Sequence, residues 1–253
     1  MLHLIGTGLY YLNDMPIRAL DALGASSEVF LESYTNLIDT GYKSELEEKI
    51  MNKIKTIGRE DVESAFLVEK ARSADIALLV PGDPLAATTH MALISQCIKE
   101  NVQYRIIHAS SIFSAVGETG LSMYKFGGAS SIPIYYENFH PDSFMDVIKA
   151  NREIGLHSLV LLEAKSEEEF VKTGDALEII NNAAVKRGME PVKPAEVVVV
   201  SRLGSETQVI ATLDELSTEP LPPTALIIPG NLSRIENEFL QELRRRQSER
   251  PSV

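Results

Sequence analysis

The sequence predicts an α/β protein of two domains, with a mostly parallel, helix-covered sheet in the first and a mixed sheet in the second. An uninterrupted apolar run, Ile76–Val80, fits a strand that is buried on both faces of a parallel sheet. Strand-like and helical segments alternate along the first half of the chain, which is typical of parallel sheets covered by helices. In the second half, Val197–Val200 and Gln208–Thr212 flank a polar turn, and this pattern predicts an antiparallel hairpin.

In the first half, strands are expected at Leu2–Ile5, Val29–Leu31, Ile76–Val80 and Tyr104–His108. Asp14 is the expected N-cap of a helix that runs through Leu23. After a polar loop at 34–42, Ser44 and Glu47 fit a capping box at the start of the next helix. Further helices are expected over Glu60–Ala71 and Thr89–Lys99.

The segment that follows Ile76–Val80 is the strongest candidate for a functional loop. Pro81 and Pro84 end the strand, Gly82 tolerates positive φ, and Asp83 is left at the carboxyl edge of the sheet. Ligands of open α/β sheets bind at that edge. The alternative is a structural loop in which Asp83 only satisfies backbone amides.

A dinucleotide-binding Rossmann domain is the first alternative to consider. Gly6-Thr7-Gly8 follows the first strand, and Glu32 closes the second. Tyr11 stands where the third glycine of the fingerprint belongs, and the connection to Asp14 is too long to bring a helix N-terminus to a pyrophosphate. The fingerprint therefore fails.

The second half is expected to begin after a glycine-rich crossing, Gly120–Gly128, with domains at 1–110 and 111–253. Besides the hairpin, strands are expected at Ile132–Tyr135, Leu159–Leu162 and Ala225–Ile228. Three helices are expected: one from Ser143, one opened by the Ser166 and Glu169 capping box and stopped by Gly188, and a last one capped by Ser233 and Glu236 that ends in Arg244–Arg246.

Composition limits the class of protein. The 253 residues are 44% hydrophobic and 24% charged, as in a globular protein, and no apolar run approaches the ~20 residues that span a membrane. With no basic leader before the first strand, we expect a cytoplasmic protein without a membrane partner. The net charge of −12 argues against nucleic-acid binding. The single cysteine, Cys97, fits a helix core, and the five histidines lack metal-ligand spacing, so no metal is expected.

Familiar catalytic motifs are absent from the sequence. There is no nucleophile elbow and no Walker lysine. Small residues at Ala109–Ser111, after the Tyr104–His108 strand, would allow a ligand close to the backbone, or would simply cap the next helix. The remaining groups suit a cofactor that brings its own reactivity.

Several motifs together resemble the diphthine synthases, which belong to the tetrapyrrole-methylase-like group. The resemblance runs nearly from end to end, and the segments that carry it are Ile5–Leu9, Glu32–Thr35, Pro81–His90, His108–Gly117, Thr119–Leu121, Tyr124–Gly127 and Leu226–Gly230.

This resemblance implies a two-domain tetrapyrrole-methylase-like fold that binds S-adenosylmethionine in a cleft between the domains and works as a homodimer. It implies methylation of the amino group of the diphthamide precursor, on the modified histidine of translation elongation factor 2. Carried over by motif, the cofactor contacts fall on Leu9, Asp83, Ala86, Ser111, Ile112, Leu162, Leu203 and Thr224. The chain departs from the family pattern at Leu203, where alanine is frequent, and at Thr224, where histidine is frequent.

Methyl transfer from a sulfonium needs orientation more than a covalent nucleophile, and orientation can supply ~7 to 11 kcal/mol of the barrier. We expect Asp83 to position the cofactor, with no catalytic side chain assigned. Two other functions stay open: a precorrin-type tetrapyrrole methyltransferase, and a noncatalytic module that binds a translation factor.

Overall fold

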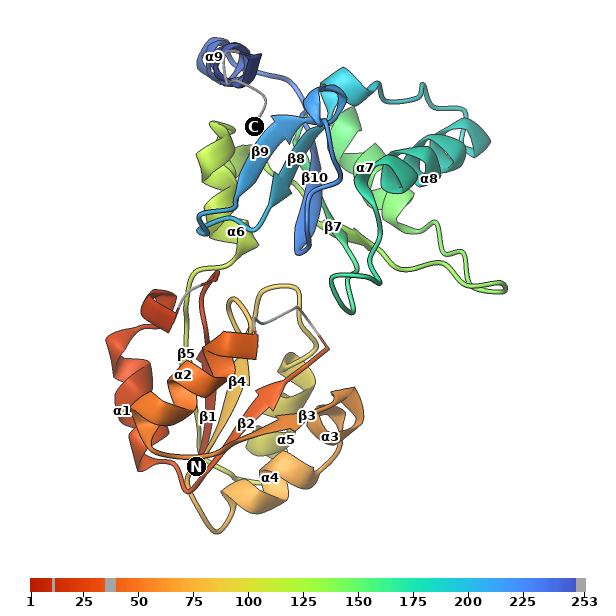
Figure 1. Cartoon of the computed structure of the whole chain (residues 1–253). Helices are drawn as coiled ribbons and strands as arrows, with labels where there is room; N and C mark the ends of the chain where they lie inside the picture. The colour runs from red at the N-terminus through yellow and green to blue at the C-terminus, as the bar shows by residue number, and fades with distance from the viewer. Residues whose placement is uncertain (11, 35–39, 249–253) are drawn as a thin grey trace. The chain divides into compact units, whose positions relative to one another are not determined.

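The computed structural model describes residues 1–10, 12–34 and 40–248, apart from the side chains of residues 40 and 244–248. The chain divides into two compact units, Met1–Ala115 and Val116–Val253 (Figure 1). The sequence predicts this boundary at residue 110. Each unit has its own sheet and its own hydrophobic core.

Unit 1 is built on a five-stranded sheet with the order β3-β2-β4-β1-β5, in which every pairing is parallel. Its strands are β1 (Leu2–Gly6), β2 (Glu28–Glu32), β3 (Ile54–Ile57), β4 (Ile76–Val80) and β5 (Tyr104–Ile107). The central strand β4 is fully buried, as its apolar run predicts. Because the strands are parallel, their carboxyl ends share one edge of the sheet.

Helices cover both faces of this sheet (Figure 1). They are α1 (Ile17–Ala25), α2 (Thr40–Ile50), α3 (Arg59–Glu63), α4 (Phe66–Ala71) and α5 (Met91–Lys99). The short α6 (Ile112–Ala115) follows β5 and does not contribute to either core cluster. Leu79 of β4 belongs to the core cluster that includes α1 and α2, whereas Leu78 belongs to the one that includes α3, α4 and α5. Successive strand residues point to opposite faces, so β4 contributes side chains to both core clusters.

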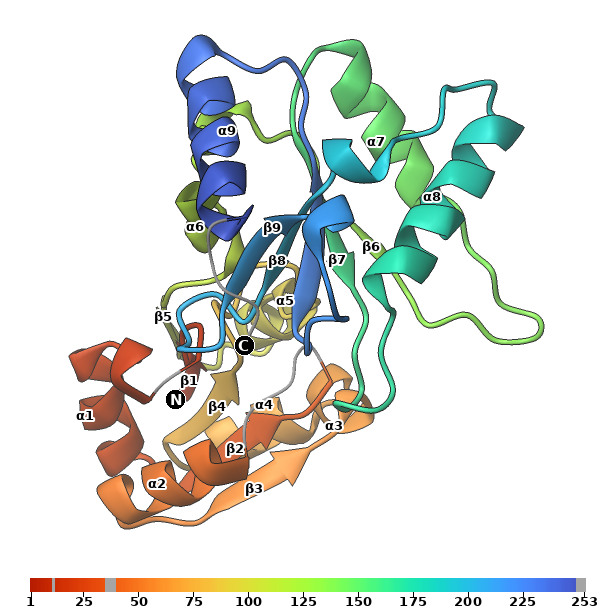
Figure 2. The ribbon, with the colours of Figure 1, turned by 45° about the horizontal axis from the view of Figure 1, so that its top comes forward.

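Unit 2 has a mixed five-stranded sheet with the order β6-β7-β10-β8-β9. Its strands are β6 (Ser130–Ile132), β7 (Ser158–Leu162), β8 (Val198–Ser201), β9 (Val209–Thr212) and β10 (Thr224–Ile228). β6 and β7 are parallel, and the other pairings are antiparallel, including the predicted β8–β9 hairpin. Helices α7 (Phe144–Glu153) and α8 (Thr173–Lys186) pack on one face, and α9 (Arg234–Ser248) lies on the other (Figure 2). The predicted α/β class, with a parallel and a mixed sheet, is confirmed.

Several helix starts differ from the prediction. Asp14 does not cap α1: Pro16 is the residue before the helix, and Asp14 Oδ2 instead accepts the Tyr10 amide at 2.9 Å. α2 begins at Thr40, ahead of Ser44, so Glu47 lies inside the helix and accepts the Ile54 amide at 2.8 Å. The expected capping box there is wrong, and part of the expected 34–42 loop, residues 35–39, lies outside the described residues.

The predicted capping box at Ser166 is also wrong. Ser166 Oγ accepts the amides of Glu168 and Glu169, which makes a turn, and α8 begins only at Thr173. Its predicted end is confirmed, because Gly188 follows the helix with φ of +67° and donates to the Val185 carbonyl at 3.0 Å.

Three further differences concern element bounds. β3 was not predicted, because only Ile54 and Ile57 of its four residues are buried and the strand shows no alternation. The Glu60–Ala71 helix is interrupted between α3 and α4, and β6 begins at Ser130 rather than Ile132. Ser233 and Glu236 cap α9 as predicted, through bonds of 2.7 and 3.3 Å. The Arg244–Arg246 side chains lie outside the described residues.

Candidate cofactor site

In unit 1, the backbones that follow β1 and β4 lie directly against each other. Gly8 and Gly82 exchange hydrogen bonds of 3.2 and 3.0 Å, and both have positive φ, +84° and +73°. A Cβ added to Gly6 would lie 2.5 Å from the Gly82 oxygen and 2.8 Å from the Ala109 Cβ. Glycine is therefore required here for close approach as well as for backbone conformation. The two glycine motifs of the sequence form one backbone cradle at the carboxyl edge.

Asp83 is fixed inside this cradle by several donors. Oδ1 accepts the Leu85 amide at 2.9 Å, and Oδ2 accepts the Ala109 amide at 3.2 Å and the His108 Nδ1–H at 2.8 Å. The Asp83 side chain is 14% exposed, whereas His108 is 59% exposed. The carboxylate thus satisfies amides, as the structural alternative expected, and it also holds a histidine at the sheet edge.

The segment after β5 completes the same edge. Ser111 is buried, and α6 begins at Ile112 directly after it. The Ser114 hydroxyl contacts both the Ser111 amide (3.1 Å) and the Ser111 carbonyl (2.9 Å), so it closes the first turn. A Cβ built on Gly82 would lie 3.6 Å from the Ser111 Cβ, an ordinary contact. The loops after β4 and β5 are therefore neighbours.

The predicted cofactor residues of unit 1 all lie on these loops. Leu9 follows Gly8, and the Ala86 amide donates to the Asp83 carbonyl at 3.1 Å within the turn after β4. Leu9, Ala86 and Ile112 are half-buried. The structure thus brings Leu9, Asp83, Ala86, Ser111 and Ile112 together at one sheet edge.

The predicted residues of unit 2 also share one edge of their sheet. Leu162 ends β7, Thr224 begins the antiparallel β10, and Leu203 follows β8. Leu203 is 5% exposed, and the Thr224 hydroxyl donates to the Leu221 carbonyl at 3.3 Å. Leu203 comes directly after Arg202, whose φ is +47°.

Two buried histidines, His90 and His157, form acid–base pairs that residue spacing does not predict. His90 Nε2–H donates to Glu32 Oε2 at 2.8 Å, and His90 Nδ1–H donates to the Pro84 carbonyl at 2.9 Å. Burial disfavours the charged ring, but the hydrogen bond and the charge of Glu32 outweigh it, so the pKa of His90 is raised. The signal that could have found the pair is position: Glu32 ends β2, and β2 lies beside β4.

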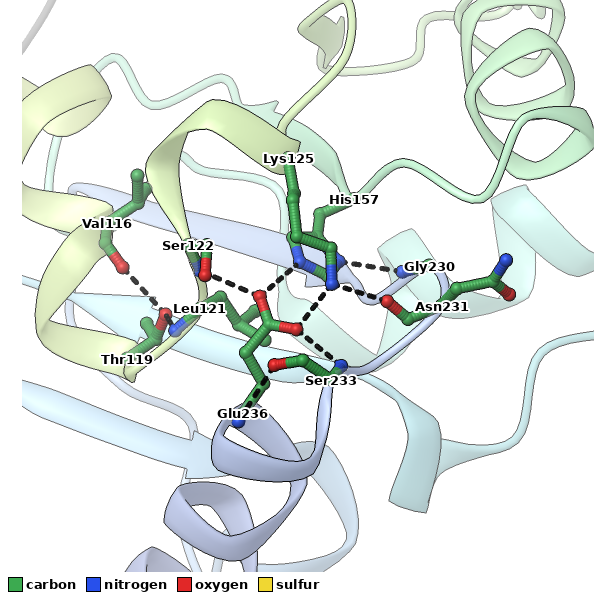
Figure 3. A network of polar contacts seen from close by, with 10 residues as sticks. All are labelled: Val116, Thr119, Leu121, Ser122, Lys125, His157, Gly230, Asn231, Ser233 and Glu236. Atoms are coloured by element: carbon green, nitrogen blue, oxygen red, sulfur yellow. Dashed lines mark hydrogen bonds and ion pairs between the residues drawn. The ribbon is translucent and has the colours of Figure 1, made fainter.

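The second pair, His157 and Glu236, is part of a network of polar contacts in unit 2 (Figure 3). The Glu236 carboxylate is 1% exposed and accepts from His157 Nε2–H at 3.2 Å, from the Ser122 amide at 2.9 Å and from Lys125 Nζ. Burial opposes the charge of Glu236, but the Lys125 ammonium and the amides hold its pKa well below the usual range. This network joins α9 to the glycine-rich segment and to the start of β7.

A cavity of about 520 Å³ lies at the other end of the unit 2 sheet. Its lining includes Ser158, Val198 and Ile228, which are the ends of β7, β8 and β10 opposite to Leu162 and Thr224. It is therefore separate from the predicted cofactor residues of that unit. Within the described ranges, no group of three or more His, Cys, Asp or Glu residues could hold a metal ion. In the same part of the chain, no helix is long and apolar enough to cross a membrane.

Comparison with known proteins identifies the class. A model of the family described as Tetrapyrrole (Corrin/Porphyrin) Methylases matches residues 1–217, and the chain belongs to this family of methylases. Diphthine methyl ester synthase from Bos taurus is 38% identical over 95% of this chain and 94% of its own length. Diphthine synthase from Methanothermobacter thermautotrophicus is 36% identical over 96% of this chain and 95% of its own. A crystal structure of diphthine synthase has a TM-score of 0.85 at 31% identity and covers 96% of each chain. The resemblance drawn from the motifs is confirmed.

Proposed function

We propose that this chain is an S-adenosylmethionine-dependent N-methyltransferase that acts on the diphthamide precursor, on the modified histidine of translation elongation factor 2. The observation that carries the proposal is the end-to-end similarity to diphthine synthases, 36% to 38% identical over 95% or more of this chain. The close approach of the Gly6 and Gly82 backbones beside Asp83 supports the proposal, because a Cβ on Gly6 would lie 2.5 Å from the Gly82 oxygen.

The proposed cofactor contacts are the predicted set from the two units. The residues fit the group: Asp83 offers a carboxylate to a positively charged cofactor, and the backbone beside Gly82 is open enough to accept a Cβ without a clash. Leu162 and Leu203 add buried apolar surface at the edge of the second sheet. When bound, S-adenosylmethionine supplies a methyl group on a sulfonium whose leaving group is a neutral thioether.

The chain must also accept a proton, because an ammonium group has no lone pair and loses one proton before each methylation. Asp83 is poorly placed for this, since its oxygens already accept N–H groups from Leu85, Ala109 and His108. His108 is the better acceptor. Its Nδ1–H donates to Asp83, so the neutral ring carries its lone pair on Nε2, and the side chain is 59% exposed. The proton then passes to water.

The proposed partner is the elongation factor, and the proposed assembly is a homodimer in the cytoplasm. The net charge of −12 fits an enzyme that does not bind nucleic acid. Size-exclusion chromatography with light scattering tests the dimer, and a monomer mass over a tenfold concentration range would contradict it.

The test of function is transfer of radiolabelled methyl groups from S-adenosylmethionine to three acceptors. These are the elongation factor that carries the diphthamide precursor, the unmodified factor and a precorrin. We expect label only on the modified factor. Label on the precorrin would favour a tetrapyrrole methyltransferase, and binding of the factor without label would favour a noncatalytic module.

Mass spectrometry of the labelled factor then counts the methyl groups and locates them. The relatives' names include both diphthine synthase and diphthine methyl ester synthase, and the proposal for this chain is methylation of nitrogen. An added methyl that is removed by mild alkali would place an ester on oxygen as well.

A further inference from the structure

A fully buried pair, His90 and Glu32, is hydrogen-bonded to the turn that follows β4. Both side chains are 0% exposed. The ring bridges the Glu32 carboxylate at the end of β2 and the Pro84 carbonyl in the turn. The Pro84 carbonyl also accepts the Thr88 hydroxyl at 2.8 Å. Pro84 adjoins Asp83, so the pair fixes the backbone that carries the proposed cofactor carboxylate.

The hydrogen bonds of His90 define its protonation state. A peptide carbonyl can only accept, so Nδ1 carries a proton. With Glu32 as a carboxylate, which also only accepts, Nε2 carries a second proton. The geometry thus describes an imidazolium between two acceptors. The raised pKa of His90 agrees, because the hydrogen bond and the charge of Glu32 exceed the cost of burial.

His157 in unit 2 is a natural contrast, since it is also buried against a glutamate. Its Nε2–H donates to Glu236, but its Nδ1 accepts the Gly230 amide at 2.9 Å. One nitrogen donates and the other accepts, which is a neutral ring. Burial accordingly lowers the pKa of His157 and outweighs the opposing effect of Glu236. The partner of Nδ1 therefore distinguishes the two protonation states. The Pro84 carbonyl needs a proton on Nδ1 of His90, whereas the Gly230 amide needs a lone pair on Nδ1 of His157.

Other charged groups around His90 do not replace Glu32. Burial and the Glu32 charge raise the pKa of Tyr34 to about 12, so its hydroxyl, 3.4 Å from His90 Nε2, stays neutral. Glu63 of α3 bonds to the Thr89 hydroxyl at 3.2 Å and to Arg59 at 2.9 Å. The Arg59 guanidinium lies 5.6 Å from the centre of the Tyr34 ring. Glu32 is the carboxylate in direct contact with the ring.

We propose that His90, held as a buried imidazolium by Glu32, is a positioning residue that fixes the Pro84 turn for cofactor binding. This rests on the proposed function. If the ring loses the Nδ1 proton, a nitrogen lone pair faces the Pro84 oxygen, and only Thr88 still donates to that oxygen. Because the pKa is raised, this contact is complete below the ordinary histidine value of ~6.5 and is lost as pH rises through the raised value.

The first test is nitrogen NMR of the histidine rings in the intact protein. The His90 signals are assigned through bonded correlations in the wild-type protein, so the assignment requires no variant. At neutral pH we expect both His90 nitrogens to be protonated and His157 to have one protonated nitrogen. A neutral His90 ring at neutral pH would overturn the proposal, even if the variants do not fold.

The second test is calorimetric titration with S-adenosylhomocysteine between pH 6 and pH 10. Wild-type affinity should fall about tenfold or more at the alkaline end, as a charge-assisted hydrogen bond is lost. Glu32→Gln keeps an acceptor but removes the charge, so the fall should move to lower pH. Glu236→Gln, the matched change in unit 2, should leave the pH of the fall unchanged.

The outcomes separate this inference from the proposed function. Affinity that is independent of pH and of Glu32→Gln overturns the positioning role and leaves the cofactor proposal intact. Failure of the wild-type protein to bind S-adenosylhomocysteine at any pH overturns the proposed function, whereas the NMR result still reports the state of His90.

Discussion

Replacing Gly6 by alanine is the most direct structural perturbation of the glycine cradle. The new Cβ would lie 2.5 Å from the Gly82 oxygen, 2.8 Å from the Ala109 Cβ and 3.0 Å from the Pro84 Cδ. The first contact is about 1 Å shorter than an ordinary contact, and its partner is backbone, which cannot rotate away. Overpacking of this kind costs about 1 to 3 kcal/mol. The cradle must widen, so binding of S-adenosylhomocysteine should weaken as well.

Gly24→Ala is the matched control for this substitution. Gly24 lies in α1, is exposed, and has nothing within 4 Å of an added Cβ. Alanine in a helix is favoured over glycine by roughly 0.5 to 1 kcal/mol, so this variant should be slightly stabilised. Urea unfolding measures the free energy of unfolding of both variants, and calorimetry measures their affinity. Equal stability of the two variants, with unchanged affinity in Gly6→Ala, would refute the close-packed cradle.

Three further predictions concern charged side chains. Glu236→Gln should lower the free energy of unfolding, measured by urea titration, by about 2 to 3 kcal/mol. This is less than the cost of breaking a fully buried ion pair, because Lys125 is 22% exposed. An unchanged free energy of unfolding would contradict the network. Folding lowers the pKa of Glu236, so its contribution to the free energy of unfolding is complete above the ordinary value of ~4.3 and is lost as pH falls below that value. Acidification should therefore destabilise the wild-type protein more than Glu236→Gln. Parallel plots of unfolding free energy against pH for the two proteins would disprove this. His108→Asn should slow methylation about 10²-fold at neutral pH and by a smaller factor at higher pH, with unchanged affinity for S-adenosylhomocysteine. A loss of rate that is the same at every pH would exclude His108 as the proton acceptor.

The central features of the fold are predictable from sequence because they depend on local signals. The apolar run Ile76–Val80 becomes the buried strand β4, and the two segments around 201–208 form the predicted hairpin. Gly188 ends α8 through its own positive φ. In each case the structure follows from properties of the same residues that form it, which the sequence shows directly.

The errors arise where a side chain that could cap a helix bonds to a different backbone amide nearby in the sequence. Asp14 has the chemistry of an N-cap, but its carboxylate bonds to the Tyr10 amide. Glu47 satisfies the amide of Ile54 in the following strand instead of a helix start. Because residue spacing permits both the cap and the alternative bond, the sequence pattern alone does not decide between them.

The candidate site likewise combines features that the sequence predicts with contacts that it does not predict. Asp83 and the glycines around it can be located from the strand and its prolines, but the contact between Asp83 and His108 joins two strands that are neighbours only through β1. The Glu32–His90 pair likewise spans residues 58 apart. The residues of such pairs are visible in the sequence, whereas their pairing requires the sheet order.

The central claim is that the carboxyl edge of β4, with Asp83, binds the methyl donor. Calorimetry with S-adenosylhomocysteine tests it most directly, with Asp83→Ala compared against Asp21→Ala, which removes an exposed carboxylate from α1. We predict binding to the wild-type protein and to Asp21→Ala, and binding at least about tenfold weaker to Asp83→Ala. Equal affinity in all three proteins would contradict the role of Asp83, and no binding to the wild-type protein would contradict the account as a whole.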